Sequence, residues 1–260
     1  MTPSRQTALI TGAGNGIGRA IAIAMAENDR NVVCADIDLS AAETTVATIR
    51  QLGVEATALK VDVGETSEIS NMIQDIERQF GRLDILVNNA GVTRAADIME
   101  LTEADWDKIH RVNAKGVFFC LQNAAKQMIE QGNGGRIINI ASIAGRGFSG
   151  TSNAAYSASK GAVISLTKTA AQQLAKHNIT VNSICPGVTT TEIVEGLVKT
   201  RAEARGISVE AMVKEMTDNI PLKRANEPED IAAMAIFLAS SGARNITGQS
   251  YNVDGGLVTS

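Results

Sequence analysis

Residues 7–18 read Thr-Ala-Leu-Ile-Thr-Gly-Ala-Gly-Asn-Gly-Ile-Gly, a short apolar run that leads directly into a glycine-rich turn. The run 7–11 has the length and composition of a buried strand, and a helix is expected from about Ile17 to Glu27. Glycines permit a tight turn and a close approach of backbone to phosphate, and the N-terminus of the following helix attracts anions. The pattern predicts a pyrophosphate-binding turn, to which we assign Gly12, Asn15, Gly16, Ile17 and Gly18.

The next predicted strand, residues 31–36, indicates which dinucleotide the turn would hold. It ends at Asp36, 18 positions after Gly18. A carboxylate there accepts hydrogen bonds from a ribose 2′-hydroxyl and repels a 2′-phosphate. Because no Lys or Arg stands at Asn15 or Ile37 to offset that repulsion, we expect NAD as the cofactor rather than NADP. A solvated carboxylate at a strand end is the alternative interpretation.

Apolar runs of strand length alternate with longer helical patterns along most of the chain. Such alternation predicts an α/β fold, a single-domain, doubly wound parallel sheet of Rossmann type with helices on both faces. We expect one domain over residues 1–260, with an insertion at 187–225 over one end of the sheet. About seven strands are expected, at 7–11, 31–36, 56–63, 83–88, 136–142, 180–184 and 250–254. Helices are expected at about 17–27, 40–52, 66–80, 102–131, 156–177 and 229–239.

Tyr156 and Lys160 stand four positions apart in one predicted helix, so their side chains should lie on the same face. A phenol beside an ammonium is expected to have its pKa lowered from the usual value of about 10. Such a phenol can exchange a proton with a substrate oxygen. Taken alone, such a pair is more often a packed ring and a solvated amine than a catalytic pair.

Composition limits the classes of function that are open to the chain. Its 24 Lys and Arg against 28 Asp and Glu give a net charge of −4, and no basic run suggests a nucleic-acid or membrane partner. No apolar run approaches the roughly 18 residues of a membrane span. The isolated His110 and His177 do not predict a metal site, and the cysteines read as buried thiols. We expect a cytoplasmic protein without a metal; the cysteines are Cys34, Cys120 and Cys185.

With these residues in view, the chain resembles the short-chain dehydrogenase/reductases over nearly its full length. Residues 11–18 resemble the cofactor turn of that family, and Asp62-Val63 resembles its adenine contact. Asn88-Asn89-Ala90-Gly91 is similar to its NNAG element, and Pro186-Gly187 to the turn after its sixth strand. Four residues match its catalytic tetrad in order and spacing: Asn113, Ser142, Tyr156 and Lys160.

The resemblance implies roles for these residues. Tyr156 would be the general acid or base, and Ser142 would orient the reacting carbonyl or alcohol. Lys160 would lower the Tyr156 pKa and hold the nicotinamide ribose, and Asn113 would support a water chain to Lys160. Beyond those already named, the cofactor-binding residues implied are Asp62, Val63, Asn89, Gly187, Thr189 and Thr191. The resemblance also implies a homotetramer.

The substrate is less well specified than the chemistry. The insertion at 187–225 is expected to form a lid, and residues 145–153 are small and polar apart from Arg146 and Phe148. The C-terminal pattern is similar to that of the butanediol/acetoin and polyol dehydrogenases, so a polyol, sugar or small diol is the expected substrate. Two alternatives stay open: a 3-oxoacyl-[acyl-carrier-protein] reductase, and a non-catalytic protein that senses NAD.

Overall fold

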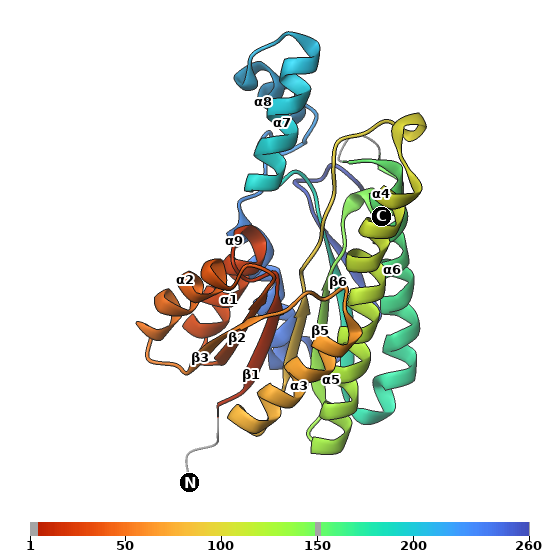
Figure 1. Ribbon diagram of the computed structural model, residues 1–260. Coiled ribbons are helices and arrows are strands. Elements are labelled where there is room, and N and C mark those ends of the chain that lie inside the picture. Colours follow the sequence, from red (N-terminus) through yellow and green to blue (C-terminus); the bar gives the residue numbers. More distant parts are fainter. Residues whose placement is uncertain (1–4, 149–151, 260) are drawn as a thin grey trace.

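Parallel strands form the centre of the protein in the computed structural model, which describes residues 5–148 and 152–259 (Figure 1). Within this part of the chain, seven strands make one sheet in the order β3-β2-β1-β4-β5-β6-β7, and every pairing is parallel. Their bounds are β1 Thr7–Thr11, β2 Asn31–Asp36, β3 Ala56–Lys60, β4 Ile85–Asn88, β5 Gly135–Ile140, β6 Ile179–Pro186 and β7 Ser250–Val253. The predicted parallel sheet is therefore confirmed, although β3 ends three residues earlier than the sequence indicated.

Helices cover both faces of the sheet, as expected. The face that packs on α1, α2 and α9 forms one apolar core, and the face that packs on α3, α5 and α6 forms the other. The bounds are α1 Gly16–Glu27, α2 Leu39–Arg50, α3 Thr66–Phe80, α4 Glu103–His110, α5 Val117–Gln131, α6 Ala154–Leu174, α7 Glu192–Arg205, α8 Val209–Asp218 and α9 Pro228–Ala239.

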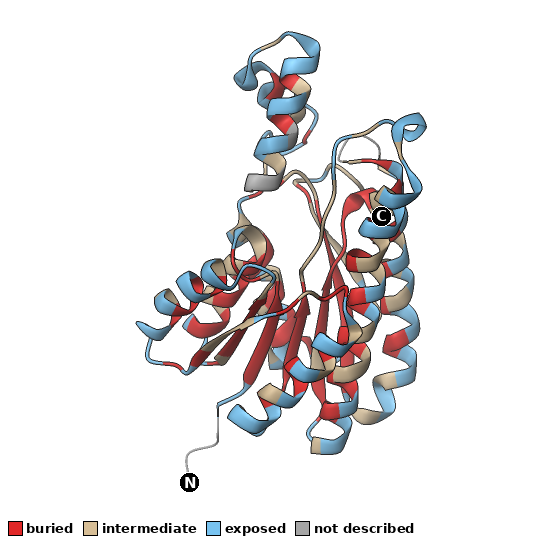
Figure 2. Ribbon diagram, in the orientation of Figure 1, coloured by how far each residue is buried: buried red, intermediate tan, exposed pale blue. Residues whose placement is uncertain are grey.

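The strands explain how one short segment contributes to both cores. Successive side chains of a strand point to opposite faces of the sheet. In β1, Ala8 and Ile10 belong to the core under α1 and α9, whereas Leu9 belongs to the core under α3 and α5. All three are fully buried, which is why the strand reads as a continuous apolar run (Figure 2).

The long helix predicted over 102–131 is interrupted in the structure. A π-helical segment, Arg111–Gly116, separates α4 from α5. Gly116, the last residue of this segment, packs closely on the loop that follows β3. A Cβ on this glycine would lie 2.7 Å from the Val63 carbonyl oxygen. The wider turn is a common feature of functional sites, and here it carries Asn113.

The insertion forms two helices that rise beyond the carboxyl ends of the strands (Figure 1). Val198 and Ala202 of α7 pack on Met212 of α8 in a small apolar core of their own. The two ends of the insertion are tied together, because Asn226 N–H donates to the Val188 carbonyl oxygen at 2.8 Å and the Asn226 carbonyl accepts from Thr190 N–H at 2.9 Å. These two hydrogen bonds hold the ends of the insertion together, so α7 and α8 project as one unit.

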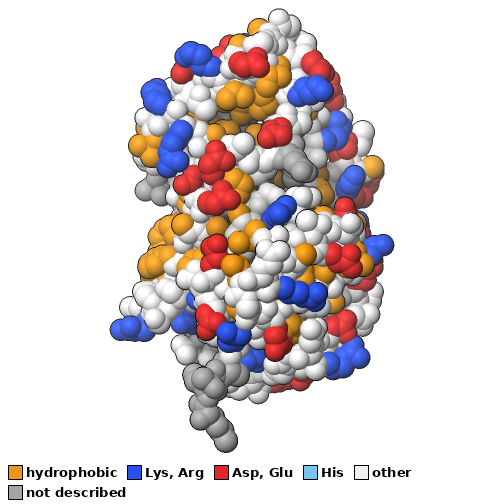
Figure 3. Space-filling model, turned by 90° about the vertical axis from the view of Figure 1, so that its left-hand side faces the viewer, with side chains coloured by type: hydrophobic (Ala, Val, Ile, Leu, Met, Phe, Trp, Pro, Cys, Tyr) orange, Lys and Arg blue, Asp and Glu red, His pale blue; other side chains and the backbone are white. Residues whose placement is uncertain are grey.

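The surface of the protein carries charges of both signs, and its cysteines are buried. On the face shown in Figure 3, acidic and basic side chains are interspersed and do not gather by sign. No helix among the described residues is long and apolar enough to cross a membrane. All three cysteines are free and buried, and burial raises the pKa of Cys34 and Cys120 to about 12, so these thiols are unreactive.

Candidate active site

The glycine-rich turn between β1 and α1 lies at the point where the strand order reverses, which is where open α/β sheets bind ligands. Gly12 and Gly16 have φ values of +64° and +52°, a region that side chains disfavour. A Cβ on Gly12 would lie 2.9 Å from the Ala90 Cα, and one on Gly18 only 2.0 Å from the Gly12 carbonyl oxygen. Each of these positions therefore requires glycine.

A second loop holds the turn in place. Thr11 Oγ1 accepts from the backbone N–H groups of Asn89 and Ala90, both at 3.1 Å. The Asn89 side chain returns two hydrogen bonds, to the carbonyl oxygens of Thr11 and Gly12, both at 3.0 Å. Asn89 therefore fixes the shape of the phosphate turn as well as facing the pocket.

Asp36, which is predicted to select the cofactor, also stabilises the glycine-rich turn. Asp36 Oδ2 accepts from the Gly14 N–H at 2.8 Å, and its Oδ1 accepts from the Asp38 N–H at 3.0 Å. The carboxylate thus links the end of β2 to the glycine turn. It and Ile37 also line the pocket described next.

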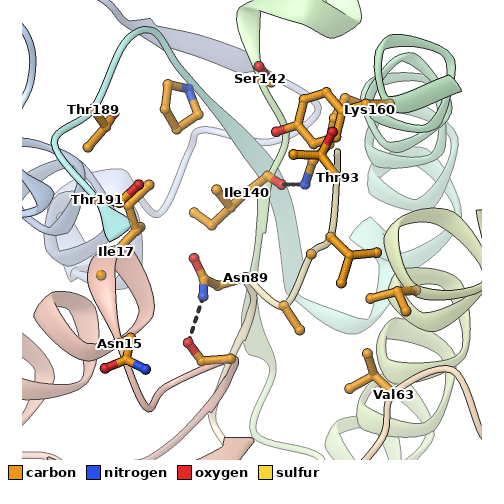
Figure 4. A pocket seen from close by; sticks show the side chains of 18 of the residues that line it. Asn15, Ile17, Val63, Asn89, Thr93, Ile140, Ser142, Lys160, Thr189 and Thr191 are labelled. Carbon is orange, nitrogen blue, oxygen red and sulfur yellow. Dashed lines mark hydrogen bonds between the residues drawn. The ribbon is translucent and has the colours of Figure 1, made fainter. Parts of the chain in front are cut away.

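One pocket of about 390 Å³ joins the glycine turn to Tyr156. Asn15, Ile17 and Thr191 lie on one side of it, with Ser142, Thr93 and Lys160 on another (Figure 4). All the site residues expected from the sequence line it except Gly18 and Asn113, which lie behind its wall. Those that line it are Gly12, Asn15, Gly16, Ile17, Asp36, Asp62, Val63, Asn89, Ser142, Tyr156, Lys160, Gly187, Thr189 and Thr191.

These residues fit a dinucleotide. Helix α1 starts at Gly16 with no side-chain cap bond from Asn15 and no acidic residue in its first turn, so its N–H groups face the pocket without a competing carboxylate. Thr191 closes over this end, since its Cγ2 would lie 3.3 Å from a Cβ on Gly16. A pyrophosphate would be held here, with the adenosine towards Asp36 and Asp62 and the nicotinamide towards Tyr156.

An ion cluster that the sequence did not reveal holds the part of the pocket wall that contains Asp62. Arg111 donates to Asp62 at 3.0 Å and to Glu65 at 2.7 Å. Asp62 also accepts from the Gly64 N–H at 2.8 Å. Since Arg111 begins the π-helical segment, the cluster fixes the loop after β3 relative to the segment that carries Asn113.

The Lys160 amine is buried and anchored at the end of β5. Its Nζ donates to the Ile140 carbonyl oxygen at 2.8 Å and lies 5.7 Å from the centre of the Tyr156 ring. The Ser142 hydroxyl oxygen accepts from the Ala144 N–H at 3.1 Å, which orients it at the start of the next short helix. The helix α6 thus brings Tyr156 and Lys160 to the same wall as Ser142.

The expected acidification of Tyr156 is not what the protein environment produces. Burial raises the Tyr156 pKa above its usual value, and a hydrogen bond with Ser142 opposes this only in part. The ring keeps some contact with solvent through the pocket, but protein atoms surround its other sides. Burial also lowers the Lys160 pKa to about 8. The prediction was wrong in sign because loss of hydration on burial outweighs the hydrogen bond with Ser142.

Asn113 holds the loop that leaves β4. Its side chain forms two bonds with Val92, accepting from the N–H at 2.8 Å and donating to the carbonyl at 2.9 Å, and it also donates to Ser159 Oγ at 3.2 Å. Its Oδ1 and Lys160 Nζ would lie 3.4 and 3.5 Å from a Cβ on Gly91, so a glycine keeps the space between them open. The water chain implied by the resemblance stays a prediction.

A smaller pocket of about 90 Å³ continues from Tyr156 and Ser142 towards the insertion. The sequence analysis expected the insertion and residues 145–153 near the substrate but did not indicate which of their side chains would line this pocket. It missed Thr93, for which the preceding NNAG element was the available signal. The side chains of Thr93 and Ser152 are hydrogen-bonded to each other. Further lining residues are Val188, Val194, Val198, Arg201 and Met216.

The small polar stretch at 145–153 is only partly described, since residues 149–151 lie outside the described ranges. Arg146, the charged residue of this stretch, lines neither pocket. Its guanidinium donates to the Ser250 carbonyl oxygen on β7. Among the described residues, no group of three or more His, Cys, Asp or Glu is placed to hold a metal ion.

Known proteins match the chain along nearly its whole length. A family model described as enoyl-(acyl carrier protein) reductase matches residues 12–258. A 3-oxoacyl-[acyl-carrier-protein] reductase of Staphylococcus epidermidis is 41% identical, with 97% of this chain and 98% of the relative covered. A sorbitol dehydrogenase of Cereibacter sphaeroides is 40% identical, with 96% of both chains covered.

Solved structures agree with this picture. An NAD+-bound xylitol dehydrogenase superposes with a TM-score of 0.91 at 33% identity, covering 98% of this chain and 100% of the other. A putative 2-deoxy-D-gluconate 3-dehydrogenase from Agrobacterium tumefaciens with bound NADP gives 0.85 at 37% identity, covering 99% of each chain. Together with the fold and the pocket, these matches show that the chain belongs to the short-chain dehydrogenase/reductase family of oxidoreductases.

Proposed function

We propose that the protein is an NAD-dependent dehydrogenase that interconverts a secondary alcohol, of the polyol, sugar or small diol type, and the corresponding ketone. One observation carries the proposal: Tyr156, Ser142 and Lys160 line the same pocket as the glycine turn and Asp36. A proton-transfer group and a dinucleotide cradle are thereby within one cavity, as hydride transfer between a cofactor and a substrate requires.

The residues at the wall supply position and proton transfer. Ser142 is oriented by the Ala144 N–H and is hydrogen-bonded with Tyr156, so a substrate oxygen would bind beside both hydroxyls. In reduction the Tyr156 hydroxyl donates its proton to the carbonyl oxygen, and in oxidation the ionised Tyr156 accepts the proton of the substrate hydroxyl. A bound nicotinamide dinucleotide would supply the hydride donor or acceptor. Lys160, anchored on Ile140, is placed to hold the ribose of that dinucleotide.

Polar groups beside Tyr156 support a hydroxylated substrate. The small pocket has the side-chain oxygens of Thr93, Ser142 and Ser152 on its wall. Hydroxyl groups both donate and accept, so they can bind additional hydroxyls of a polyol or sugar. The apolar side of the pocket, on α7 and α8, can exclude water once the substrate is bound.

A second candidate is a 3-oxoacyl-[acyl-carrier-protein] reductase, because a relative of that description is as similar in sequence as the sorbitol dehydrogenase. The pocket of about 90 Å³ next to Tyr156 favours a small substrate over a long acyl chain, and Asp36 at the adenosine end favours NAD.

A side-by-side assay separates the two candidates. We expect oxidation of diols and polyols with NAD+ to exceed reduction of acetoacetyl thioesters in kcat/KM by about tenfold or more, followed by NADH absorbance. A preference for the thioester, especially with NADPH, would establish the reductase instead.

Replacement of the proton-transfer group tests the role of Tyr156. We expect Tyr156→Phe to lower kcat by about 10²–10⁴-fold, the usual contribution of a general acid or base. NADH binding, followed by fluorescence, should be unchanged because the ring remains. Tyr251→Phe is the matched control, since it makes the same chemical change on β7 outside the pocket. Near-normal kcat in Tyr156→Phe would exclude the assigned role.

The pH dependence follows from the raised Tyr156 pKa. A phenol with a raised pKa is protonated at neutral pH, so it is ready to donate a proton in reduction but must first ionise to accept one in oxidation. Oxidation should therefore speed up as pH rises from 6 to 10, measured as log kcat/KM, and reduction should not. An oxidation rate independent of pH over this range would contradict the assignment.

Asp36 is expected to set the choice of cofactor. We predict that Asp36→Ala combined with Ile37→Arg raises the ratio of kcat/KM for NADP over NAD by about tenfold, because a like-charge repulsion of about 1–4 kcal/mol is removed. The ratio is the proper readout, since loss of the Asp36 bond to Gly14 disturbs the turn for both cofactors alike. Ile37→Ala alone is the control, and an unchanged ratio in the double variant would show that another residue discriminates.

A further inference from the structure

The pocket beside Tyr156 and Ser142 contains a cation that the mechanism has not used. Among the described residues that line this pocket, Arg201 is the one charged side chain. The remaining polar groups on its wall are hydroxyls, and the other side chains are apolar. Arg201 is therefore the described side chain of this pocket that can recognise an acidic group of a substrate.

Helical geometry places Arg201 on the inner face of α7. Val194, Val198 and Arg201 follow one another at spacings of four and three residues, so they share one face of the helix, and all three line the pocket. Arg201 is accordingly half-buried, whereas its neighbour Lys199 is exposed. The other arginine at the end of this helix, Arg205, is exposed and bound to Glu215 at 2.6 Å.

The chemistry of the group specifies its ligand. A guanidinium keeps its charge at every physiological pH and presents five donors in a planar fork that matches a carboxylate. Arg201 also has a contact within the protein, and five donors allow it to keep such a contact while binding an anion. A phosphate dianion would call for more positive charge than this single group, so a carboxylate is the better match.

We propose that the substrate is a small hydroxy acid, whose carboxylate binds Arg201 while its secondary alcohol lies at Ser142 and Tyr156. This inference rests on the proposed dehydrogenase function and narrows it to hydroxylated compounds that carry an acid group. Arg201 then selects the substrate and fixes which hydroxyl reaches Tyr156.

Matched substrates that differ only in the acid group test the proposal. Two pairs are 3-hydroxybutyrate with butane-1,3-diol, and gluconate with sorbitol. We expect the acid to exceed its partner alcohol in kcat/KM by about tenfold or more in at least one pair, since hydrogen bonds to charged groups are the strong ones. Arg201→Met should lower kcat/KM for the acid by about ten- to a hundredfold, chiefly through KM, and leave the alcohol within about threefold. Lys199→Met is the control, because it removes an exposed charge from the same helix.

A second readout does not require turnover. Butanoate should bind the NADH complex of the wild type, measured by the change in NADH fluorescence, and bind Arg201→Met about tenfold more weakly. Equal use of acid and alcohol by the wild type, an equal loss for both in Arg201→Met, or no butanoate binding would each overturn the proposal. Failure of every alcohol and acid to be oxidised would instead refute the dehydrogenase function, and the butanoate measurement would still decide the role of Arg201.

Discussion

The active site depends on the close docking of α6 against the carboxyl end of β5. The Lys160 amine is buried, and a buried charge is tolerated only where hydrogen bonds replace water. Its bond to the Ile140 carbonyl oxygen fills that need and fixes α6 along its axis. The approach is possible because the loop after β5 has glycine at 145, where a Cβ would lie 2.6 Å from the Lys160 carbonyl carbon. The contact of Lys160 with β5 thus determines where α6 holds Tyr156 relative to the sheet.

The other walls of the pocket are held in place by side chains that hydrogen-bond to backbone groups of neighbouring loops. Asn113 holds the loop after β4 through Val92, and Asn89 holds the glycine turn through Thr11 and Gly12. Arg111 holds the loop after β3 through Asp62. Each bond connects the end of one strand to the element beside it, so the pocket is shaped before any ligand enters it. Such preorganisation is what positioning a substrate against a cofactor requires.

Much of this arrangement could be predicted from local patterns. The continuous apolar strands predicted a parallel sheet with two covered faces, and the glycine-rich turn predicted where a dinucleotide would bind. Two features escaped prediction because they depend on the three-dimensional packing. The sign of the Tyr156 pKa shift is set by burial, which spacing within a helix does not reveal. The position of Arg201 at the pocket depends on how α7 packs over it, which no local pattern in the sequence indicates.

The most direct test of the whole account is a crystal structure of the protein with NAD+. The account predicts the adenosine at Asp36 and Asp62, the pyrophosphate at the start of α1, and the nicotinamide against Tyr156 and Ser142 with its ribose on Lys160. A dinucleotide bound in the opposite direction, or bound outside the pocket that connects the glycine turn to Tyr156, would contradict it.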